Sequence, residues 1–494
     1  MKKTLYAIAV VLTVSVSSSC EKWLEATSST TIPVYRLMET RGGFCDALSG
    51  IYILMGNEYQ YGGNMSFDFM DKVAYPYAYS SSVNQKALQT HNYSNTYVKA
   101  QITETWRTNY NVVANINLVL QYLESNKDVL SSELEYKLFK GELLGLRAFT
   151  HFNVMRAFGL GNVQGDNAGK LTIPYLTVYD KEPVAQKTYS QTIGLIQSDL
   201  DECLACLEET DPLAGKISND DFDRMNQDSF WSNRKKHFNY FAALATRARL
   251  FQWMGDLANA AQTAQAVIDG SGELVEWVNP TSLIQEQMEK GNYSFSTEHI
   301  FSLEISEMLG KVSEMMIMTT GNDEYCIPED FVDDILYPRI DPQTGSFAGA
   351  EDVRGPLVHL QYDRHNYKCY KLMPATMSSW SDSGVFPMIR ISEMYYMVAE
   401  NLIAEGKGED ALRILDEVRR HRGISDDYNP ALVNADEELM KEYYREFIAE
   451  GQIIYWLKHK GVSSSLSPSF TLSHQDLVIP YPQEEIDYGR VQEL

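Results

Sequence analysis

The segment from Phe386 to Gly423 most constrains how this chain can fold. Its first part carries apolar residues at the three- and four-residue steps of an amphipathic helix, at Ile391, Met394, Tyr395, Val398 and Leu402. Gly406 and Gly408 interrupt the pattern, and a second apolar series then runs into a group of basic residues and Gly423. Cations stabilise a helix C-terminus, where carbonyls are unpaired, and glycine takes the left-handed conformation that closes a helix. The segment is therefore predicted to form a tight antiparallel helical hairpin.

A second segment repeats the spacing of this hairpin. Small and apolar residues follow one another at steps of 12, 4 and 3 in the later segment, at Ala399, Ala411, Leu415 and Val418. The same steps occur earlier, at Ala248, Ala260, Ala264 and Val267. Small residues that face each other let paired helices approach closely, as in tetratricopeptide-type repeats. The spacing predicts helical repeats, with Ala260 and Ala411 at the closest approach of their hairpins.

The N-terminus is typical of a bacterial lipoprotein signal. Two lysines precede an apolar run over residues 5–16, which is followed by Ser17 to Ser19 and Cys20. The run is shorter than the roughly 20 apolar residues that a membrane-spanning helix needs. We expect residues 1–19 to be a signal peptide and Cys20 to be lipidated. Ser17 stands where the strictest form of this signal has leucine, so a conventional signal peptide with an incidental cysteine is the alternative.

The remaining chain is expected to form one body over residues 20–494, with an N-terminal half over 20–270 and a C-terminal half over 271–494. Its formal net charge of −25 argues against nucleic acid as a partner, because that binding needs cations to displace phosphate counterions. Beyond Cys20 the cysteines are scattered, without a disulfide framework or zinc spacing. Cys203 and Cys206 form a C-x-x-C inside a helical pattern, so they are predicted to lie on a helix face rather than to form a redox pair.

Helical segments alternate with two long irregular stretches. Helices are predicted over about 40–55, 106–123, 134–158, 189–207 and 436–458. The irregular stretches cover 56–98 and 270–386, with a short strand predicted at His299–Glu304. The predicted fold class is mainly α, a tetratricopeptide-like helical repeat scaffold with large irregular loop insertions. Loops on a rigid scaffold usually carry the binding groups.

Several segments in a fixed order resemble the SusD/RagB family of outer-membrane nutrient-binding lipoproteins. They are GELLGLRAFTHFNVMRAFG, IPYLTVYDKEP with TYSQTIGLIQSDLDEC, PMIRISEMYYMVAEN, EVRRHRGI, EYYREFIAEGQ and HQDLVIPYPQEEI. The chain departs from the family pattern at Tyr443 and Ile453, where arginine is usual, and at Trp456, where aspartate is frequent.

The resemblance implies four tetratricopeptide-like helix pairs. It also implies a lipid-anchored protein on the outer membrane that faces the cell surface. Its partner would be a SusC-like TonB-dependent transporter, to which it delivers an oligosaccharide or, in some members, a peptide.

Aromatic residues in the two irregular stretches are the candidate ligand-binding residues. Tyrosine offers a pyranose ring an apolar face and a hydroxyl group. The candidates are Tyr75, Tyr77 and Tyr79 in the first stretch, and Trp277, Tyr293 and Tyr325 in the second. If the chain around Pro76 is extended, the three tyrosines share one face and suit stacking along an oligosaccharide. The alternative is that these rings pack the loops onto the scaffold.

Glutamates in two helical segments are candidate catalytic residues, but structural roles are favoured for both sets. Glu393 and Glu400 lie two helical turns apart, a separation that would suit a glycosidase pair, but Arg390 is expected to pair with Glu393. Glu442, Glu446 and Glu450 are expected to be a helix face.

His359 and His365 bracket an aspartate in a loop that could hold a metal, although plain surface is favoured. No phosphate loop or nucleophile elbow is present. We therefore expect no cofactor, no metal and no catalytic residues. The hypotheses are a glycan-binding lipoprotein, a peptide-capturing member of the same family, a secreted hydrolase and a repeat scaffold that binds only proteins.

Overall fold

A computed structural model describes residues 33–161, 165–285, 293–305, 308–312, 325–339, 345, 349–363, 366–372, 384–461 and 472–489. The structure is mainly helical, as predicted, and one hydrophobic core runs from Met38 to Ile479. Signal-peptide residues 1–19 and Cys20 lie outside the described residues. Within the described residues, no helix is both long and apolar enough to cross a bilayer.

The N-terminal helices are α2 (Val34–Leu37), α3 (Arg41–Met55), α4 (Phe69–Ala74), α5 (Val83–Gln89), α6 (Thr96–Ser125), α7 (Glu133–Phe158), α8 (Tyr189–Thr210) and α9 (Asn219–Met225). Helices α3, α6, α7 and α8 confirm the predicted helices, whereas α4 and α5 lie in the stretch 56–98 that was predicted to be irregular. Side-chain caps explain several starts, since Thr40 accepts a hydrogen bond from the amide of Gly43, and Thr188 forms a capping box with Gln191. Helix α6 begins ahead of the predicted residue 106 because the Asn95 side chain caps its first turn.

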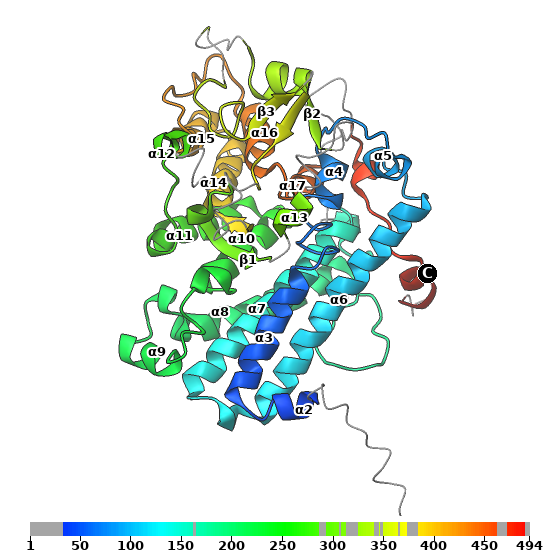
Figure 1. The fold of residues 1–494 in the computed structure, drawn as a ribbon, viewed down its shortest axis with the longest axis vertical. Coiled ribbons are helices and arrows are strands. Elements are labelled where there is room, and N and C mark those ends of the chain that lie inside the picture. Colours follow the sequence, from blue (N-terminus) through cyan, green and yellow to red (C-terminus); the bar gives the residue numbers. More distant parts are fainter. Residues whose placement is uncertain are drawn as a thin grey trace, which may run out of the picture.

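The later helices carry the repeated hairpins. They are α10 (Tyr240–Trp253), α11 (Leu257–Gly270), α12 (Pro280–Gln285), α13 (Met308–Val312), α14 (Ile391–Ala404), α15 (Gly408–Arg420), α16 (Ala435–Phe447) and α17 (Ile453–Lys460). In the described chain, four helix pairs pack together: α3 with α6, α7 with α8, α10 with α11, and α14 with α15. Figure 1 places α3, α6, α7 and α8 in the lower part of the molecule, and α10, α11, α14 and α15 above them.

The two hairpins have matching turns. Gly255 and Gly406 take positive φ angles of 76° and 77° at the same place in each turn. Helix α11 also packs on α14, so the two hairpins lie against each other. All residues at the repeated spacing are buried, with Ala260 and Ala411 almost completely so. The predicted helical hairpins and their small-residue spacing are confirmed.

Enlarging Ala411 is expected to destabilise the protein. Because this side chain is fully buried between packed helices, Ala411→Leu should overpack the core at a cost of about 1–3 kcal/mol. Ala260→Leu should behave in the same way, whereas Ala258→Leu, at an exposed position of the same helix α11, is the matched control. Urea denaturation measures the difference, and equal midpoints for all three variants and the wild type would refute the close approach.

Short strands lie in the second irregular stretch. They are β1 (His299–Glu304), β2 (Cys326–Pro328), β3 (Leu360–Asp363), β4 (Asn366–Cys369) and β5 (Val385–Arg390). Strand β1 is confirmed and pairs antiparallel with β5, so the segment that precedes α14 is a strand up to Arg390. Strands β2, β4 and β3 form a second antiparallel sheet, in that order, at the top of Figure 1.

The single helix predicted over 436–458 is wrong, because the chain turns between α16 and α17. Ala449 and Gly451 take positive φ angles of 62° and 66°. Their backbone amides donate to the buried carboxyl group of Asp71, at 3.0 and 3.1 Å, and Tyr77 donates to it at 2.5 Å. Burial raises the pKa of Asp71 to about 7 despite these donors. A long-range contact with the first irregular stretch therefore breaks the helix.

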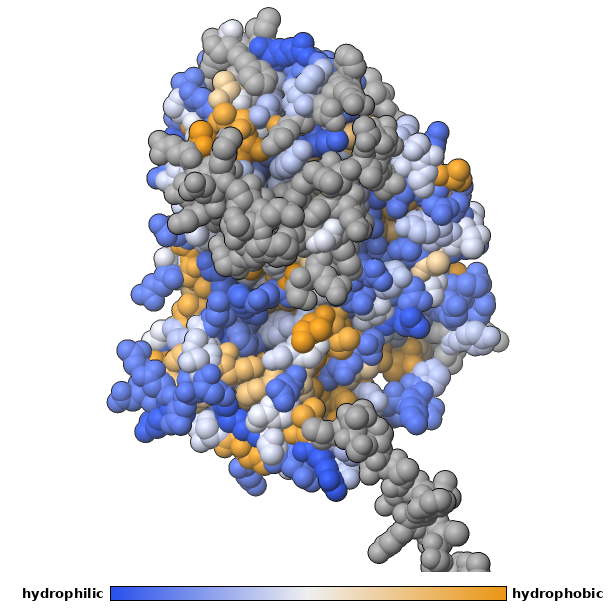
Figure 2. Space-filling view, viewed as in Figure 1, coloured by the Kyte–Doolittle hydropathy of each residue, from blue (hydrophilic) through white to orange (hydrophobic). Residues whose placement is uncertain are grey.

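The face of the molecule in Figure 2 is mainly hydrophilic where its residues are coloured. Hydrophobic side chains on this face lie in small separate groups.

Candidate ligand-binding site

An open cleft of about 450 Å³ lies beside the three-stranded sheet. It is lined by residues from the end of β2 through the π-helical turn η8 (Phe331–Leu336), namely Pro328, Glu329, Asp330, Asp333, Asp334 and Arg339. π-Helical turns often mark functional sites. Four carboxylates and one guanidinium in one cleft offer both hydrogen-bond acceptors and donors to a polar ligand.

Ion pairs fix the polar groups of this cleft. The Arg339 side chain donates to Asp333 at 2.9 Å from Nε and 2.6 Å from Nη2, and it also pairs with Glu329. The hydrogen bond that Arg339 donates to Asp333 is the main reason why the pKa of Arg339 is raised. Tyr367 donates to the other oxygen of Asp333 at 2.6 Å, and burial together with this bond raises the tyrosine pKa.

Tyr362 stands next to the cleft on β3. Its hydroxyl donates to Oε2 of Glu329 at 3.0 Å, while 54% of its surface is exposed. Its ring lies 5.3 Å from that of Tyr367, centroid to centroid, at an interplanar angle of 66°. An exposed ring whose hydroxyl is tied to a carboxylate wall presents a flat apolar face next to polar groups, which is the arrangement that sugar binding needs.

The helical scaffold holds the cleft from behind. Arg445 of α16 donates to the carbonyl of Leu336, at the end of η8, from both Nε and Nη2 at 3.0 and 2.5 Å. The ring of Phe331, at the start of η8, packs against Tyr75 and Tyr444 with centroids 6.0 and 5.7 Å apart. The turn that carries the carboxylates is therefore anchored at both ends.

The prediction that Tyr75, Tyr77 and Tyr79 share one ligand-facing side does not hold in the structure. Only 1% of Tyr75 and 5% of Tyr77 is exposed, and their rings lie 5.0 Å apart. Tyr77 also packs edge-on against the buried ring of Tyr325, and the amide of Ala78 donates to the Cys326 carbonyl. These rings join the two irregular stretches to each other and leave no face for a ligand.

The other candidates are differently placed. Tyr79 remains 59% exposed, on the segment that continues from the Ala78 contact to β2. Trp277 is half-buried, and one face of its indole stacks on His421 at 4.4 Å and 5°. Tyr293 is half-buried, and its carbonyl contacts Nε2 of His359 at 2.8 Å. Of these candidates Tyr79 is the most exposed, and the Lys86 ammonium lies over its ring, 5.9 Å from the centroid.

Sequence reasoning missed Tyr362 and the acidic wall. Tyr362 lies in the segment HLQYDRH, whose histidines indicate only a possible metal site, and the wall lies in the acidic run PEDFVDD. His359 is fully buried, and His365 lies outside the described residues. Among the described residues, no group of His, Cys, Asp and Glu side chains could hold a metal.

The three glutamates expected to share a helix face are buried instead, two of them on α16 and Glu450 in the turn that follows it. Glu442, Glu446 and Glu450 are buried in a network of charges with Arg354, Arg390, Arg422 and Lys371. The expected pairing of Arg390 with Glu393 is wrong, since Arg390 reaches Glu446 and Glu450 instead. Glu393 pairs with Arg249 of α10 at 2.6 Å. Arg390 ends a strand, so its side chain follows the sheet toward α16 and not the face of α14.

This network should make the protein acid-sensitive. Arg354 and Arg445 hold the pKa of Glu442 at about 2 against the opposing effect of burial, and arginines hold that of Glu446 well below its usual range. A lowered native pKa gives stability that is present above the ordinary value of about 4.3 and is lost as the pH falls toward about 2. Urea unfolding at intervals from about pH 7 to about pH 2.5 should show stability that begins to fall below about pH 6.5, because burial lowers the pKa of His151 and His299 to about 3, and that falls more steeply below about pH 4.5, where the carboxylates of the network are protonated. Equal stability at both ends would contradict the network.

The carboxylates considered for hydrolysis are structural. Glu393 is held by Arg249, and Glu400 accepts from Gln252 at 2.7 Å and contacts His459 at 3.1 Å. The hydrogen bond from His459 helps to lower the pKa of Glu400 although burial raises it, so this group is not a general acid near neutral pH.

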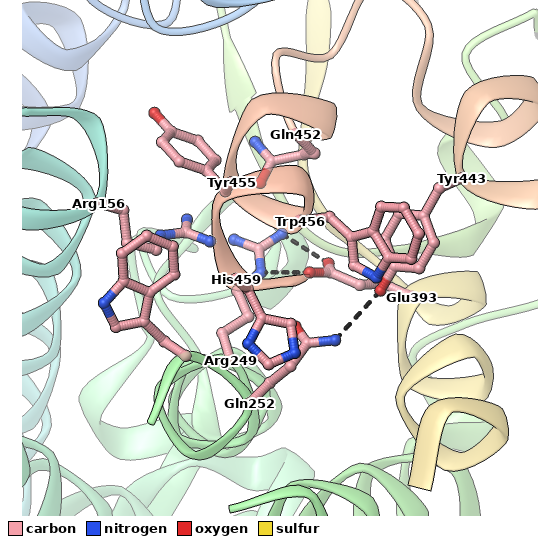
Figure 3. A pocket seen from close by; sticks show the side chains of 10 residues that line it. Arg156, Arg249, Gln252, Glu393, Tyr443, Gln452, Tyr455, Trp456 and His459 are labelled. Atoms are coloured by element: carbon pink, nitrogen blue, oxygen red, sulfur yellow. Dashed lines mark hydrogen bonds and ion pairs between the residues drawn. The ribbon is translucent and has the colours of Figure 1, made fainter. Parts of the chain in front are cut away.

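Figure 3 shows the small pocket beside these carboxylates. Its volume is about 10 Å³. That volume admits a single water and no sugar ring. Tyr443 and Trp456, two of the departures from the family pattern, stack in its wall with ring centroids 4.4 Å apart.

Cys203 and Cys206 are free and lie on α8, as predicted. Burial raises the pKa of both thiols, which leaves them unreactive.

Comparisons with known proteins agree with this fold. One family model, described as starch-binding and associating with the outer membrane (SusD-like), matches residues 22–212. A second, described as the SusD family, matches residues 356–458. A search of curated proteins finds no match.

Solved structures share the architecture over almost the whole chain. A SusD superfamily protein from Bacteroides thetaiotaomicron is 21% identical with a TM-score of 0.70, over 91% of this chain and 98% of its own. A putative sugar-binding protein from Bacteroides vulgatus is 19% identical with a TM-score of 0.67, over 91% and 96%. A laminarin-binding SusD-like protein is 20% identical with a TM-score of 0.59, over 91% and 98%.

SusD family members are binding proteins rather than enzymes. The two family models follow each other along one continuous fold whose solved neighbours are SusD superfamily proteins. By sequence pattern and by fold, the chain belongs to the SusD/RagB family.

Proposed function

We propose that this protein binds a neutral nutrient glycan in the cleft beside Tyr362 and delivers it to a SusC-like TonB-dependent transporter. The observation that carries the proposal is the exposed Tyr362 ring, tied to the acidic wall by its bond to Glu329. Carbohydrate binding by relatives supports the choice of ligand, since one matching family model is described as starch-binding and one similar structure as laminarin-binding.

The charge of the cleft favours a neutral glycan over an acidic one. Asp330 and Asp334 are exposed, and Arg339 is the guanidinium that balances part of the four carboxylates. A uronate or sulfate group would meet net negative charge at this wall, whereas sugar hydroxyl groups would donate to the carboxylates. Tyr79 is proposed as a second aromatic contact for the glycan. The amide of the preceding residue, Ala78, donates to the Cys326 carbonyl of β2, an edge strand of the three-stranded sheet.

The site is tested by Tyr362→Ala. We expect the affinity for the bound glycan to fall at least about fivefold, because the loss of an aromatic contact in a binding site costs more than about 1 kcal/mol. The free energy of unfolding should stay within about 0.5 kcal/mol, since the ring is exposed. Tyr179→Ala, which removes a ring that is 51% exposed on a different segment, is the control for binding by isothermal titration calorimetry. Unchanged affinity for Tyr362→Ala would place the site elsewhere.

We further propose that residues 1–19 are removed and that Cys20 carries the lipid anchor of a single body over 20–494. Cys20→Ser should then leave the protein folded but release it from the outer-membrane fraction, because one anchor with two or more acyl chains suffices for stable attachment. Fractionation followed by immunoblotting measures the release in a strain that lacks the transporter, so that the partner cannot retain the variant. Undiminished membrane association there would count against the anchor.

A further inference from the structure

One buried arginine has no carboxylate partner. Arg156, near the end of α7, is only 5% exposed, and no described carboxylate lies within ion-pair distance of its guanidinium. Its guanidinium donates from Nη2 to the side-chain oxygen of Asn153. The guanidinium lies between the rings of Phe152 and Tyr455, 4.5 and 4.1 Å from their centroids, while Nε has no hydrogen-bond partner.

The uncompensated charge faces the small pocket of Figure 3. This pocket is formed where α7, α10, α14, α16 and α17 meet, and its charged lining residues are Arg156, Arg249, Glu393 and His459. Figure 3 shows the guanidinium groups of Arg156 and Arg249 turned toward each other. Arg249 donates to both carboxylate oxygens of Glu393. No described residue accepts a hydrogen bond from Nη1 of either arginine.

A second buried basic group lies next to Arg156. Lys458 donates to the carbonyls of Arg156 and Ala157 at 2.6 and 3.0 Å and has no carboxylate partner among the described residues, and burial lowers its pKa to about 7, so it is only partly charged at neutral pH. Burial and the charge of Arg249 lower the pKa of Arg156 to about 10, which leaves the guanidinium charged at neutral pH. His459 contacts Glu400, which does not line the pocket. Among the lining residues, Glu393 is therefore the one carboxylate near the two guanidinium groups.

A buried charge without a partner is strongly destabilising, and isolated ions are rarely retained in protein interiors. We propose that the pocket binds a monatomic anion of the halide class, chloride under physiological conditions, between Arg156 and Arg249. The Nε group of Arg156 and the Nη1 group of Arg249 donate to it. The space of about 10 Å³ fits one particle of this size and excludes sulfate, carboxylates and sugars. The ion would hold α7 against α10 and α17. Its binding would not depend on the glycan site.

Bromide provides a direct test on the wild-type protein. Crystals of the full protein grown in bromide should show an anomalous difference peak within hydrogen-bond distance of the Arg156 guanidinium. The absence of a peak at that position, or a bromide-independent feature that refines as water, would overturn the proposal.

Stability in solution provides a second, independent readout. At constant ionic strength, replacing gluconate by chloride should raise the thermal midpoint of the wild type, because a ligand that binds the native state stabilises it. The chloride-dependent rise should vanish in Arg156→Gln and persist in Arg413→Gln, which removes an equal charge at an exposed position paired with Asp410. A wild type that responds equally to gluconate and chloride, or an Arg156→Gln variant that keeps the full response, would refute the site. If Arg156→Gln does not fold, the bromide experiment on the wild type decides.

Discussion

Glu446→Gln should lower the free energy of unfolding by about 3–5 kcal/mol, one of the two largest effects expected of the substitutions discussed for this protein. The Glu446 carboxylate accepts from Arg354 at 2.9 Å and from Arg422 at 2.6 Å, and it also pairs with Arg390. All four side chains are fully buried. Glutamine keeps the shape but removes the charge, so three guanidinium groups lose a shared partner, and its amide hydrogens face donors.

The matched control for this substitution is Glu417→Gln. Glu417 accepts from Arg420 on the exposed face of α15, where an ion pair contributes about 0–1 kcal/mol. Guanidinium chloride denaturation of the two variants should separate them clearly. A loss below about 1 kcal/mol in Glu446→Gln would mean that the network is dispensable for stability.

Tyr75→Ala should destabilise the protein by about 3–5 kcal/mol while its glycan affinity stays unchanged. The ring is 1% exposed and contacts Tyr77, Phe331 and Tyr444, so its removal leaves a cavity where the two irregular stretches meet. Tyr79→Ala is the control for stability, because this ring is 59% exposed and its loss should change the free energy of unfolding by no more than about 0.5 kcal/mol.

Thermal melting and calorimetric titration of the same samples distinguish packing from binding. If Tyr75→Ala melts normally and loses the glycan, the tyrosine row would be the binding surface after all, and the cleft beside Tyr362 would lose its role. If it melts early and binds normally below its melting temperature, the rings are confirmed as packing.

The scaffold could be predicted from the sequence because its information is local. The spacing from Ala399 to Val418 repeats in a second hairpin, and glycines mark the turns, so the helix faces and the packing of small residues follow from periodicity alone. Periodicity did not predict the break between α16 and α17. There the break depends on Asp71, which is distant in sequence and accepts from Ala449 and Gly451.

The buried charge network shows the same limit. Spacing along one helix pairs Arg390 with Glu393, but Arg390 lies at the end of a strand and its partners come from α16. Glu446 looks like part of a solvated face in the sequence, because nothing local indicates that arginines from β5, the end of α15 and the second irregular stretch surround it.

The sequence predicted the region of the candidate site but not the residues that form it. Loop aromatics were the correct type of side chain, yet burial of Tyr75, Tyr77 and Tyr325 depends on contacts between the two irregular stretches. Tyr362 differs from them because its strand lies at an edge of the sheet, beyond β4, where the ring keeps an open face. An edge position becomes visible only when the strand order is known.

The cleft is rigid because the helical scaffold holds its wall. Arg445 and the cluster around Phe331 tie η8 to α16, and α16 is in turn held by the charge network. A wall fixed in this way loses little freedom on binding, which favours affinity for a ligand with weak individual contacts.

The central claim is most directly tested by screening the purified protein against a panel of neutral glycans, acidic glycans and peptides, with chromatographic analysis of every ligand that binds. We expect binding to at least one neutral glycan, recovery of that glycan intact after prolonged incubation, and loss of binding in Tyr362→Ala. Binding to peptides alone, release of shorter products from a bound glycan, or no binding to any member of the panel would contradict the proposed function.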